Sequence, residues 1–409
     1  MRAKAPRFMK TIAVLGTLDS KGEEHAYVAD IIRSRGHRVI MIDVGSLEPP
    51  TTKPDITREE VAAAGGVDLA ALRAKQDRGE SVAAMAGAAA KLVERLAAGG
   101  KIDAIISLGG GGGTAIGTAA MRALPIGFPK VMVSTLAAGN TVPYIGTKDI
   151  VMFPSIVDVS GLNRISRLLL ARAAGAICGM AETVPPKTEE KPVIVASMFG
   201  NTTQCVNIAK KILEDEGYEV LVFHATGMGG RVMESLIESG LVVGVLDVTT
   251  TEWADELVGG RLGAGPTRLE AAGKSKVPAI VTPGCLDMVN FGERSSIPDK
   301  FADRLFYQHN PQVTLMRTTP EECSELGRIL AEKVNAYTTP VTVLLPRKAI
   351  SIISAPGGAF YDPEADEALF AAIKKHLKPC IPVVEMDAEI NDEVFAKACA
   401  DALLLNMKK

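Results

Sequence analysis

Five consecutive glycines, Gly109, Gly110, Gly111, Gly112 and Gly113, precede Thr114 and follow the apolar run 102–108. Glycine reaches positive φ without strain and has no Cβ to keep a ligand from the backbone. A helix that begins at about Thr114 would direct unpaired N–H groups and its positive dipole end at the same space, where phosphate commonly binds. The pattern predicts an anion or nucleotide site at residues 109–114; the alternative is a flexible glycine-rich turn.

The loop after the first apolar run carries a turn, hydroxyls, a carboxylate and an ammonium at a helix start. Its candidate contacts to a nucleotide are Gly16, Thr17, Asp19 and Lys21. Lys21 would bind phosphate directly. The alternative is that Asp19 or Ser20 only caps the helix.

Asp43 stands at the end of the next apolar run. In dinucleotide-binding folds an acid at this place accepts hydrogen bonds from ribose hydroxyls, so Asp43 is a candidate ribose contact. A carboxylate that caps the following turn is the alternative.

A fourth loop, residues 134–141, carries small polar side chains after a buried run, and it offers Ser134, Thr135, Gly139 and Asn140 as further contacts. A plain connector is the alternative. Asp149 and Asp158 follow in the chain, and either could hold a cation beside phosphates.

The second half carries different chemistry at its expected strand ends. His224, Asp247 and Glu252 are candidate general acids or bases, and Asp287 and His309 could join them in one cleft. The alternative is that these side chains cap helices and bond loop backbone. Cys285 is the one cysteine placed as a nucleophile would be, although a buried inert thiol is the favoured interpretation.

The elements that must position these residues are short apolar runs, rich in Val and Ile, that alternate with helix-length amphipathic segments. Continuous apolar strands separated by helices are typical of parallel sheets covered on both faces. We predict an α/β fold with two Rossmann-like subdomains, each a mainly parallel sheet with helices on both faces. The predicted strands are 11–15, 38–43, 102–108, 130–134, 150–153, 192–197, 219–223, 241–246, 278–282, 312–316, 340–345, 350–354 and 380–384. The predicted helices include 23–35, 81–98, 161–180, 204–216 and 320–336.

The proline-rich, charged segment 183–192 predicts a boundary between an N-terminal nucleotide-binding subdomain, 1–186, and a C-terminal subdomain, 187–409, with a possible second ligand site. The polar segment 49–79 is interpreted as a flap inserted over the first subdomain. The two halves match as copies, which places Asp43 and His224 at equivalent strand ends.

Composition narrows the class of protein. The chain has 409 residues, a formal net charge of −3 and 4% aromatic residues, which gives no reason to expect nucleic-acid binding. Its apolar runs are too short for a membrane span, and residues 1–10 are interpreted as a disordered start and not a signal peptide. The six cysteines form no C-x-x-C pair and no histidine spacing suits a metal, so we expect reduced thiols, a cytoplasmic protein and no structural metal.

Six segments in a fixed order resemble one family. They are 16–24, 109–114, 134–140, 199–203, 225–231 and 247–252. They resemble the ATP-binding domain family of the tomato mosaic virus resistance protein (Tm-one) and its microbial relatives, over nearly the whole chain after residue 10. The resemblance implies two Rossmann-like subdomains, ATP at the first and a homodimer. It extends nucleotide contact to Thr17, Asp19 and the 109–114 and 134–140 loops; the plant antiviral role is not carried over.

Together these patterns favour an ATP-binding protein that uses Mg²⁺ and acts as an enzyme on a small metabolite at a cleft between the subdomains. The alternative is a nucleotide-responsive sensor or interaction module without turnover. The glycine run lacks the lysine and hydroxyl of G-x-x-x-x-G-K-[ST], which excludes a P-loop NTPase. G-x-G-x-x-G is absent after the first run, which disfavours a nicotinamide-dependent dehydrogenase.

Overall fold

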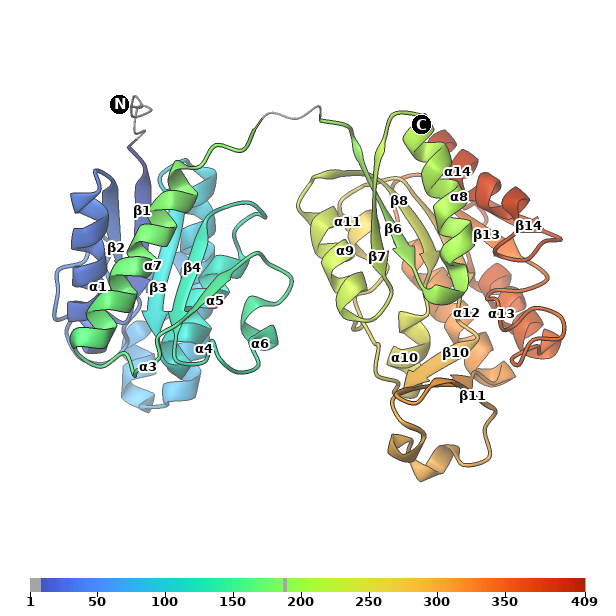
Figure 1. The fold of residues 1–409 in the computed structure, drawn as a ribbon, viewed down its shortest axis with the longest axis horizontal. Helices are drawn as coiled ribbons and strands as arrows, with labels where there is room; N and C mark the ends of the chain where they lie inside the picture. Colours follow the sequence, from blue (N-terminus) through green and yellow to red (C-terminus); the bar gives the residue numbers. More distant parts are fainter. Residues whose placement is uncertain (1–8, 187–189, 409) are drawn as a thin grey trace. The chain divides into compact units, whose positions relative to one another are not determined.

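The computed structural model describes residues 9–186 and 190–408, which form two compact units, one on each side of the gap (Figure 1). Each unit is built on its own parallel sheet with helices on both faces, which confirms the predicted α/β class. The predicted disordered start and the middle of the predicted boundary segment lie outside the described residues.

The N-terminal unit has one five-stranded parallel sheet of order β2-β1-β3-β4-β5. Its strands are short, and the central strands β1, β3 and β4 are buried since both faces of the sheet are covered there. Successive residues of β1 alternate between two cores: Ile12 and Val14 belong to one, Ala13 and Leu15 to the other. The strands are β1 (Thr11–Gly16), β2 (Arg38–Asp43), β3 (Ala104–Gly109), β4 (Lys130–Ser134) and β5 (Val151–Pro154).

Helices α1 (Leu18–Ser34) and α7 (Arg164–Glu182) pack on one face of this sheet, and α2 (Arg58–Gly65), α4 (Arg78–Ala98) and α5 (Gly111–Arg122) pack on the other. Two short helices, α3 (Leu69–Lys75) and α6 (Val142–Ile145), lie in the connections.

The segment 49–79 is part of this core and not a flap, so that prediction is wrong. Ile56 forms a parallel bridge with Ile42 of β2, and α2 packs against α4 with Val61 and Ala62 buried. Its buried apolar residues fix the segment on the sheet, although it also carries many charged and polar side chains.

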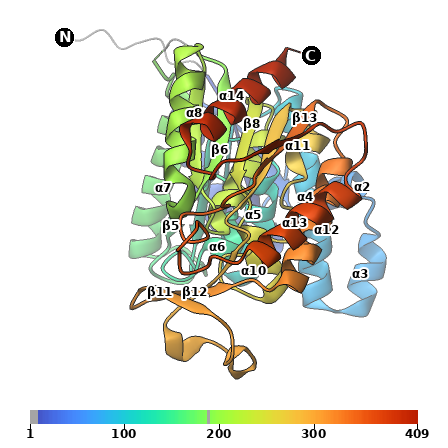
Figure 2. The same cartoon turned by 90° about the vertical axis from the view of Figure 1, so that its right-hand side faces the viewer.

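The C-terminal unit has a six-stranded parallel sheet of order β14-β13-β9-β8-β6-β7. Figure 2 shows α8 and α14 on one face and α12 and α13 on the opposite face. The strands are β6 (Val193–Met198), β7 (Glu219–His224), β8 (Val242–Thr249), β9 (Ala279–Gly284), β13 (Val341–Pro346) and β14 (Val383–Met386). The helices are α8 (Thr203–Asp215), α9 (Met228–Glu238), α10 (Glu252–Val258), α11 (Ala271–Lys274), α12 (Pro320–Asn335), α13 (Pro363–His376) and α14 (Glu393–Met407).

A separate antiparallel sheet departs from the predicted pattern. The predicted strand 312–316 becomes β12 (Val313–Arg317), which pairs with β10 (Met288–Phe291) and β11 (Phe306–Asn310) outside the parallel sheet. The predicted strand 350–354 is a turn, because Ser354 Oγ accepts the N–H groups of Ile350 and Ser351 (3.1 Å each). Both segments are apolar runs. An apolar run by itself shows neither whether a strand pairs in parallel or antiparallel nor whether the segment forms a turn.

The two units repeat the same opening. Gly36 and Gly217 follow the first helix of each unit with φ near +90° (+92° and +93°). Gly16 pairs with Asp43 at the end of β1 and β2, as Met198 pairs with His224 at the end of β6 and β7. The structure thus places Asp43 and His224 at equivalent strand ends.

Candidate functional site

A pocket of about 550 Å³ opens in the N-terminal unit between the carboxyl ends of β1 and β3. The strand order reverses at this point, and open α/β sheets bind ligands there. Its wall is built from the loops after β1, β2 and β3, the start of α4, and two residues that follow β4 and β5. The lining residues are Thr17, Asp19, Ser20, Lys21, Val44, Ser46, Leu47, Glu48, Arg78, Val82, Gly110, Gly111, Gly112, Gly113, Ile116, Thr135 and Asp158.

The glycine run divides into two roles. A Cβ at Gly109 would lie 2.7 Å from the Cα of Gly113, so this glycine permits the tight passage from β3 into α5. A Cβ at Gly111 would meet no atom of the described residues within 4 Å. Gly111 therefore faces open space, while Gly109 serves packing and does not line the pocket.

Helix α5 begins at Gly111, three residues before the predicted start, with Gly110 as its N-cap. The first intrahelical bond runs from Thr114 N–H to Gly110 O (2.8 Å). The amides of Gly111, Gly112 and Gly113 precede that bond and belong to the groups that a helix leaves for other partners. Thr114 itself is buried, with its hydroxyl 2.6 Å from Ser134 Oγ, and it does not reach the pocket.

Asp43 is fully buried and is not part of the pocket wall. Its Oδ1 accepts the N–H groups of Leu18 (3.1 Å) and Gly45 (2.9 Å), so it caps α1 from the neighbouring strand. Arg58 Nε lies 3.9 Å from Oδ2. Burial raises the pKa of Asp43 against these interactions. As the structure stands, the carboxylate positions two loops and is not presented to a ribose.

Thr17, Asp19 and Lys21 do line the pocket, and Thr17 rather than Asp19 or Ser20 is the N-cap of α1. Asp19 Oδ2 accepts Leu47 N–H (3.2 Å), and Lys21 Nζ donates to Val159 O. The backbone of Lys21 departs from helical geometry (φ −138°, ψ 29°). These contacts tie the loops after β1, β2 and β5 together.

Gly16 is buried behind this wall, because a Cβ there would overlap the ring of His25. His25 Nδ1 lies 2.6 Å from Lys21 O, and burial lowers the pKa of His25. Gly16 therefore acts through packing of the helix start and does not contact the cavity.

Only some residues of the 134–140 loop border a cavity. Ser134 and Thr135 line a second cavity, of about 460 Å³, which shares Thr135 and Asp158 with the first. Gly139 and Asn140 are exposed and line neither cavity; Asn140 Oδ1 accepts Val142 N–H (3.2 Å).

The structure distinguishes Asp149 from Asp158, the two acids that the sequence offered as alternatives for holding a cation. Asp149 accepts Lys130 Nζ (2.6 Å) and Gly127 N–H (2.9 Å), and Lys130 is completely buried. Asp158 borders both cavities. Asp149 therefore neutralises a buried lysine, and Asp158 is the acid that a ligand could reach.

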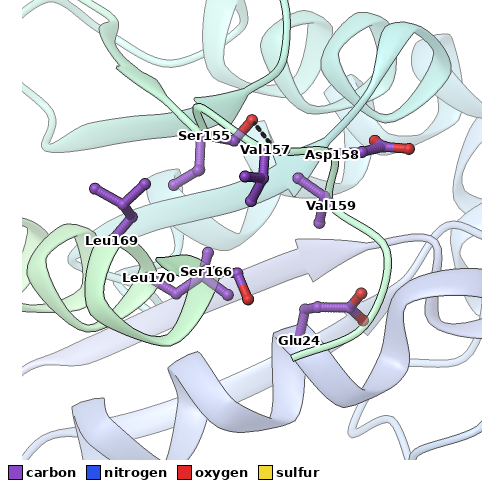
Figure 3. A pocket seen from close by; sticks show the side chains of 9 residues that line it. Glu24, Ser155, Val157, Asp158, Val159, Ser166, Leu169 and Leu170 are labelled. Atoms are coloured by element: carbon purple, nitrogen blue, oxygen red, sulfur yellow. Dashed lines mark hydrogen bonds between the residues drawn. The ribbon is translucent and has the colours of Figure 1, made fainter. Parts of the chain in front are cut away.

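The segment that carries Asp158 is fixed on α1. The buried carboxylate of Glu24 accepts Gly161 N–H (2.6 Å), next to a cavity of about 10 Å³ between this segment and α7. Figure 3 shows Val157, Val159 and Leu170 around that small cavity, with the Asp158 carboxylate directed away from Leu170. A space of this size holds at most one water molecule, so it is a packing defect beside the site and not a ligand site.

In the C-terminal unit, two of the three predicted acid–base residues are locked in a buried ion network. Arg268 contacts Asp247 through Nη1 and Nη2 (2.6 Å each) and Glu252 through Nε (2.7 Å). Glu234 lies 3.2 Å from Arg268 Nη1. Burial raises the pKa of Glu252 and of Glu234. The other predicted residue, His224, is exposed at the end of β7 and belongs to no ion pair among the described residues.

Glu252 also holds the start of α9, since its Oε1 accepts the N–H groups of Gly227 (2.7 Å) and Gly230 (3.0 Å). The expectation that His224, Asp247 and Glu252 meet in one open cleft is not met, because burial and ion pairing occupy both carboxylates. Arg268 and Glu234 were missed. No local pattern marks Arg268 as the partner of acids 16 and 21 residues away.

Cys285 is fully buried, and burial raises the pKa of its thiol well above the ordinary value. A thiol held in its neutral form is a poor nucleophile, which favours the inert alternative. Asp287 is also buried and accepts Ser351 Oγ (2.7 Å), whereas His309 is exposed on β11. These residues do not form a common open site.

The fold and the pocket define a class: an α/β protein of two parallel-sheet units, one of which opens a glycine-lined pocket at its topological switch point. Residues 10–186 match the N-terminal domain, and residues 191–407 the C-terminal domain, of the uncharacterised protein family UPF0261. The chain belongs to this family.

Relatives agree with this assignment. A UPF0261 protein of Clostridium tetani is 51% identical over 98% of this chain and 100% of its own length. The ToMV resistance protein Tm-1 of Solanum lycopersicum is 45% identical over 73% of this chain and 41% of its own length. Among solved structures, UDP-N-acetylglucosamine 2-epimerase from Rickettsia bellii matches 66% of this chain and 78% of its own at 12% identity with a TM-score of 0.22, too low to carry an argument.

Proposed function

We propose that the N-terminal unit binds a nucleotide in the glycine-lined pocket, with its phosphates on the amides of Gly111, Gly112 and Gly113. The observation that carries the proposal is the coincidence of these helix-start amides with a cavity of about 550 Å³ at the β1/β3 switch point. This volume lies in the range of small-molecule sites. ATP is the expected nucleotide, because it is the ligand that the family resemblance implies.

The charges of the wall support a metal-bound form of the ligand. Asp19, Glu48 and Asp158 face the cavity with only Lys21 and Arg78 as cations among its lining residues. Bare polyphosphate would meet an excess of carboxylates, whereas Mg²⁺ prefers carboxylate and phosphate oxygens together. ATP is therefore proposed to bind as its Mg²⁺ complex, with tighter binding in the presence of Mg²⁺ than in EDTA.

The direct test is calorimetric titration of Mg-ATP into the wild type and Gly111→Val. Valine at this position enters open space and would weaken binding at least tenfold without disturbing the fold. Gly87→Val is the matched control, because a Cβ at Gly87 also meets no described atom within 4 Å but lies on the exposed face of α4. Equal affinity of wild type and Gly111→Val would contradict the proposal.

Two uses of the bound nucleotide remain as candidates. The first is a Mg-ATP-dependent enzyme acting on a small metabolite. The second is a nucleotide-responsive sensor or interaction module without turnover, and it is favoured by the burial of Asp247 and Glu252 in an ion network. Release of ADP with a panel of neutral and charged metabolites distinguishes them, since only the enzyme produces ADP in stoichiometry with a modified metabolite.

We also propose self-association, as the family resemblance implies. Val151 on the edge strand β5 and Ile165 and Leu168 on α7 are exposed apolar side chains of one unit. Sedimentation velocity would show a dimer, and a monomer at micromolar concentration would contradict this. A cytoplasmic location is proposed on the absence of disulfides among the described cysteines. No helix of the described residues is both long and apolar enough to cross a bilayer.

A further inference from the structure

A second chamber of about 460 Å³ adjoins the proposed nucleotide pocket in the N-terminal unit. It is formed by the turn after β4 and the segment after β5. Thr135 and Asp158 line both cavities, so these two residues mark their boundary, whereas Ala138 and Ile156 border only the second chamber. The volume again suits a small molecule.

The wall of this chamber contains a strained residue. Ile156 has φ +63°, and Val157 N–H donates to Ser155 O (2.7 Å), which makes Ile156 the centre of a classic γ-turn. A β-branched residue in this conformation costs about 1–3 kcal/mol. The side chain is 76% exposed, so its own burial does not offset the strain. Such strain is typical of ligand sites, where geometry is held against local preference.

The surrounding contacts keep this geometry in place. Ser155 Oγ donates to Val157 O (2.7 Å), the bond drawn in Figure 3. Just beyond Asp158, Lys21 Nζ donates to Val159 O and Glu24 accepts Gly161 N–H. Hydrogen bonds thus hold the chain on both sides of Asp158. Those on its C-terminal side come from Lys21 and Glu24 of α1, the helix that starts at the nucleotide pocket.

The chemistry of the wall selects a ligand class. Asp158 is the single charged side chain among the lining residues of the chamber, and the Ser134 hydroxyl is occupied by Thr114 and by Leu136 N–H (3.0 Å). The Ser155 hydroxyl also lines the chamber and donates to Val157 O. The remaining surface is the Thr135 hydroxyl and apolar side chains such as Pro154 and Val157. An acid placed here would meet a carboxylate with no cation in the chamber wall, whereas a hydroxyl or ammonium group would bond with Asp158.

We propose that this chamber binds the second ligand of the protein, a small alcohol or amine with an apolar part whose polar group bonds with Asp158. The inference rests on the proposed function, since it assigns the adjoining pocket to the nucleotide. An organic acid or a phosphorylated compound as the second ligand would contradict it.

The first arm of the test separates the two cavities. Mg-ATP is titrated into the wild type, Ala138→Trp, which fills the second chamber, and Ala137→Trp, a neighbouring turn residue outside both linings. We expect all three affinities to agree within twofold, while Gly111→Val loses at least tenfold. Loss of affinity in Ala138→Trp alone would overturn the inference and leave the nucleotide proposal intact. Absence of binding to the wild type would overturn the nucleotide proposal.

The second arm identifies the ligand class by thermal shift on free protein and on protein loaded with a non-hydrolysable ATP analogue. The probes are matched sets of three to six carbons, such as butane-1,4-diol, 4-aminobutan-1-ol and succinate. We expect an alcohol or amine to raise the midpoint by about 2 °C or more in wild type and Ala137→Trp, and not in Ala138→Trp or Asp158→Asn. Stabilisation by the acids instead, or by no probe, would overturn the inference.

A third measurement tests whether this face binds another copy of the protein. Sedimentation velocity of Ala138→Trp and Ala137→Trp should match the wild type. A change of oligomeric state confined to Ala138→Trp would identify the chamber as an interface between copies and overturn the inference.

Discussion

The first three parallel strands of the two units have the same order, β2-β1-β3 and β7-β6-β8, yet their carboxyl ends differ in what fills them. In the N-terminal unit, glycines 110–113 leave a cavity of about 550 Å³. In the C-terminal unit, the equivalent end of β8 and the turn after it carry Thr249, Thr250, Thr251 and Glu252, all completely buried. Thr249 Oγ1 lies 2.8 Å from Thr202 Oγ1, so side chains bridge the two loops.

The comparison shows that strand order provides the location of a site and that side-chain volume decides whether it stays open. One unit uses bare backbone, and its helix-start glycines line the cavity. The other uses Glu252 to satisfy the helix-start amides of Gly227 and Gly230. Helix-start amides thus border a cavity after β3 of one unit, whereas those at the start of α9, after β7 of the other, are bonded within the protein.

The largest expected effect is on the closed network of the C-terminal unit. Arg268→Met leaves Glu234, Asp247 and Glu252 buried without their common cation and should destabilise this unit by about 3–5 kcal/mol. Urea unfolding followed by the fluorescence of Trp253, the only tryptophan, reports this unit directly, since its Nε1 donates to Arg268 O (3.3 Å). Arg231→Met, an exposed arginine on α9, is the control. Equal midpoints for both variants would show that the network is not a stability element.

The next effect distinguishes the two roles within the glycine run. Gly109→Ala places a Cβ 2.7 Å from Gly113 Cα and should cost about 2 kcal/mol through overpacking. Gly111→Ala should stay within about 0.5 kcal/mol of wild type, because its Cβ enters open space. Thermal unfolding of the pair measures the difference. Similar losses in both variants would mean that Gly111 is structural as well.

A pH dependence of stability is expected from Asp255 in the C-terminal unit. Burial raises the pKa of Asp255 from 3.8 to about 7, against donated bonds from Asn290 N–H (2.9 Å) and Nδ2 (2.7 Å). Between these values the folded state binds the proton more tightly than the unfolded chain. Its contribution is therefore complete below about pH 4 and is lost as the pH rises through 7, at up to ~1.4 kcal/mol per pH unit.

Comparison of wild type with Asp255→Asn by urea unfolding from pH 5 to pH 7.5 checks this dependence. The stability of wild type relative to the variant should fall as the pH rises. A constant or rising difference would show that Asp255 is ionised in the folded protein throughout this range.

The smallest effect concerns strain at the open site. Ile156→Asn removes the β-branched side chain from a left-handed position that asparagine tolerates, and it should stabilise the N-terminal unit by about 1 kcal/mol. Thermal unfolding measures the gain, and Ile165→Asn, another exposed isoleucine of the same unit, should show none. A loss of stability in Ile156→Asn would contradict the assignment of strain.

Several features could be predicted because they depend on short stretches of chain. Apolar runs separated by amphipathic segments predicted the two parallel sheets, and the glycine run indicated the position of the pocket between β1 and β3. The antiparallel sheet of β10, β11 and β12 was not predicted, because apolar runs of four to five residues carry no signal of pairing direction.

The sequence by itself determined the class of fold, the repeat of two units and the position of the bare backbone, because residue volume and apolar spacing act within one element. Only the tertiary structure decided which polar residues border a cavity. Asp43, Asp149, Asp247 and Glu252 are bound by donors distant in the chain, such as Arg268, whereas Asp158 is directed into open space. Burial and contacts with residues distant in the chain determine whether a carboxylate is bonded within the protein or accessible. The residues next to it in the sequence determine neither.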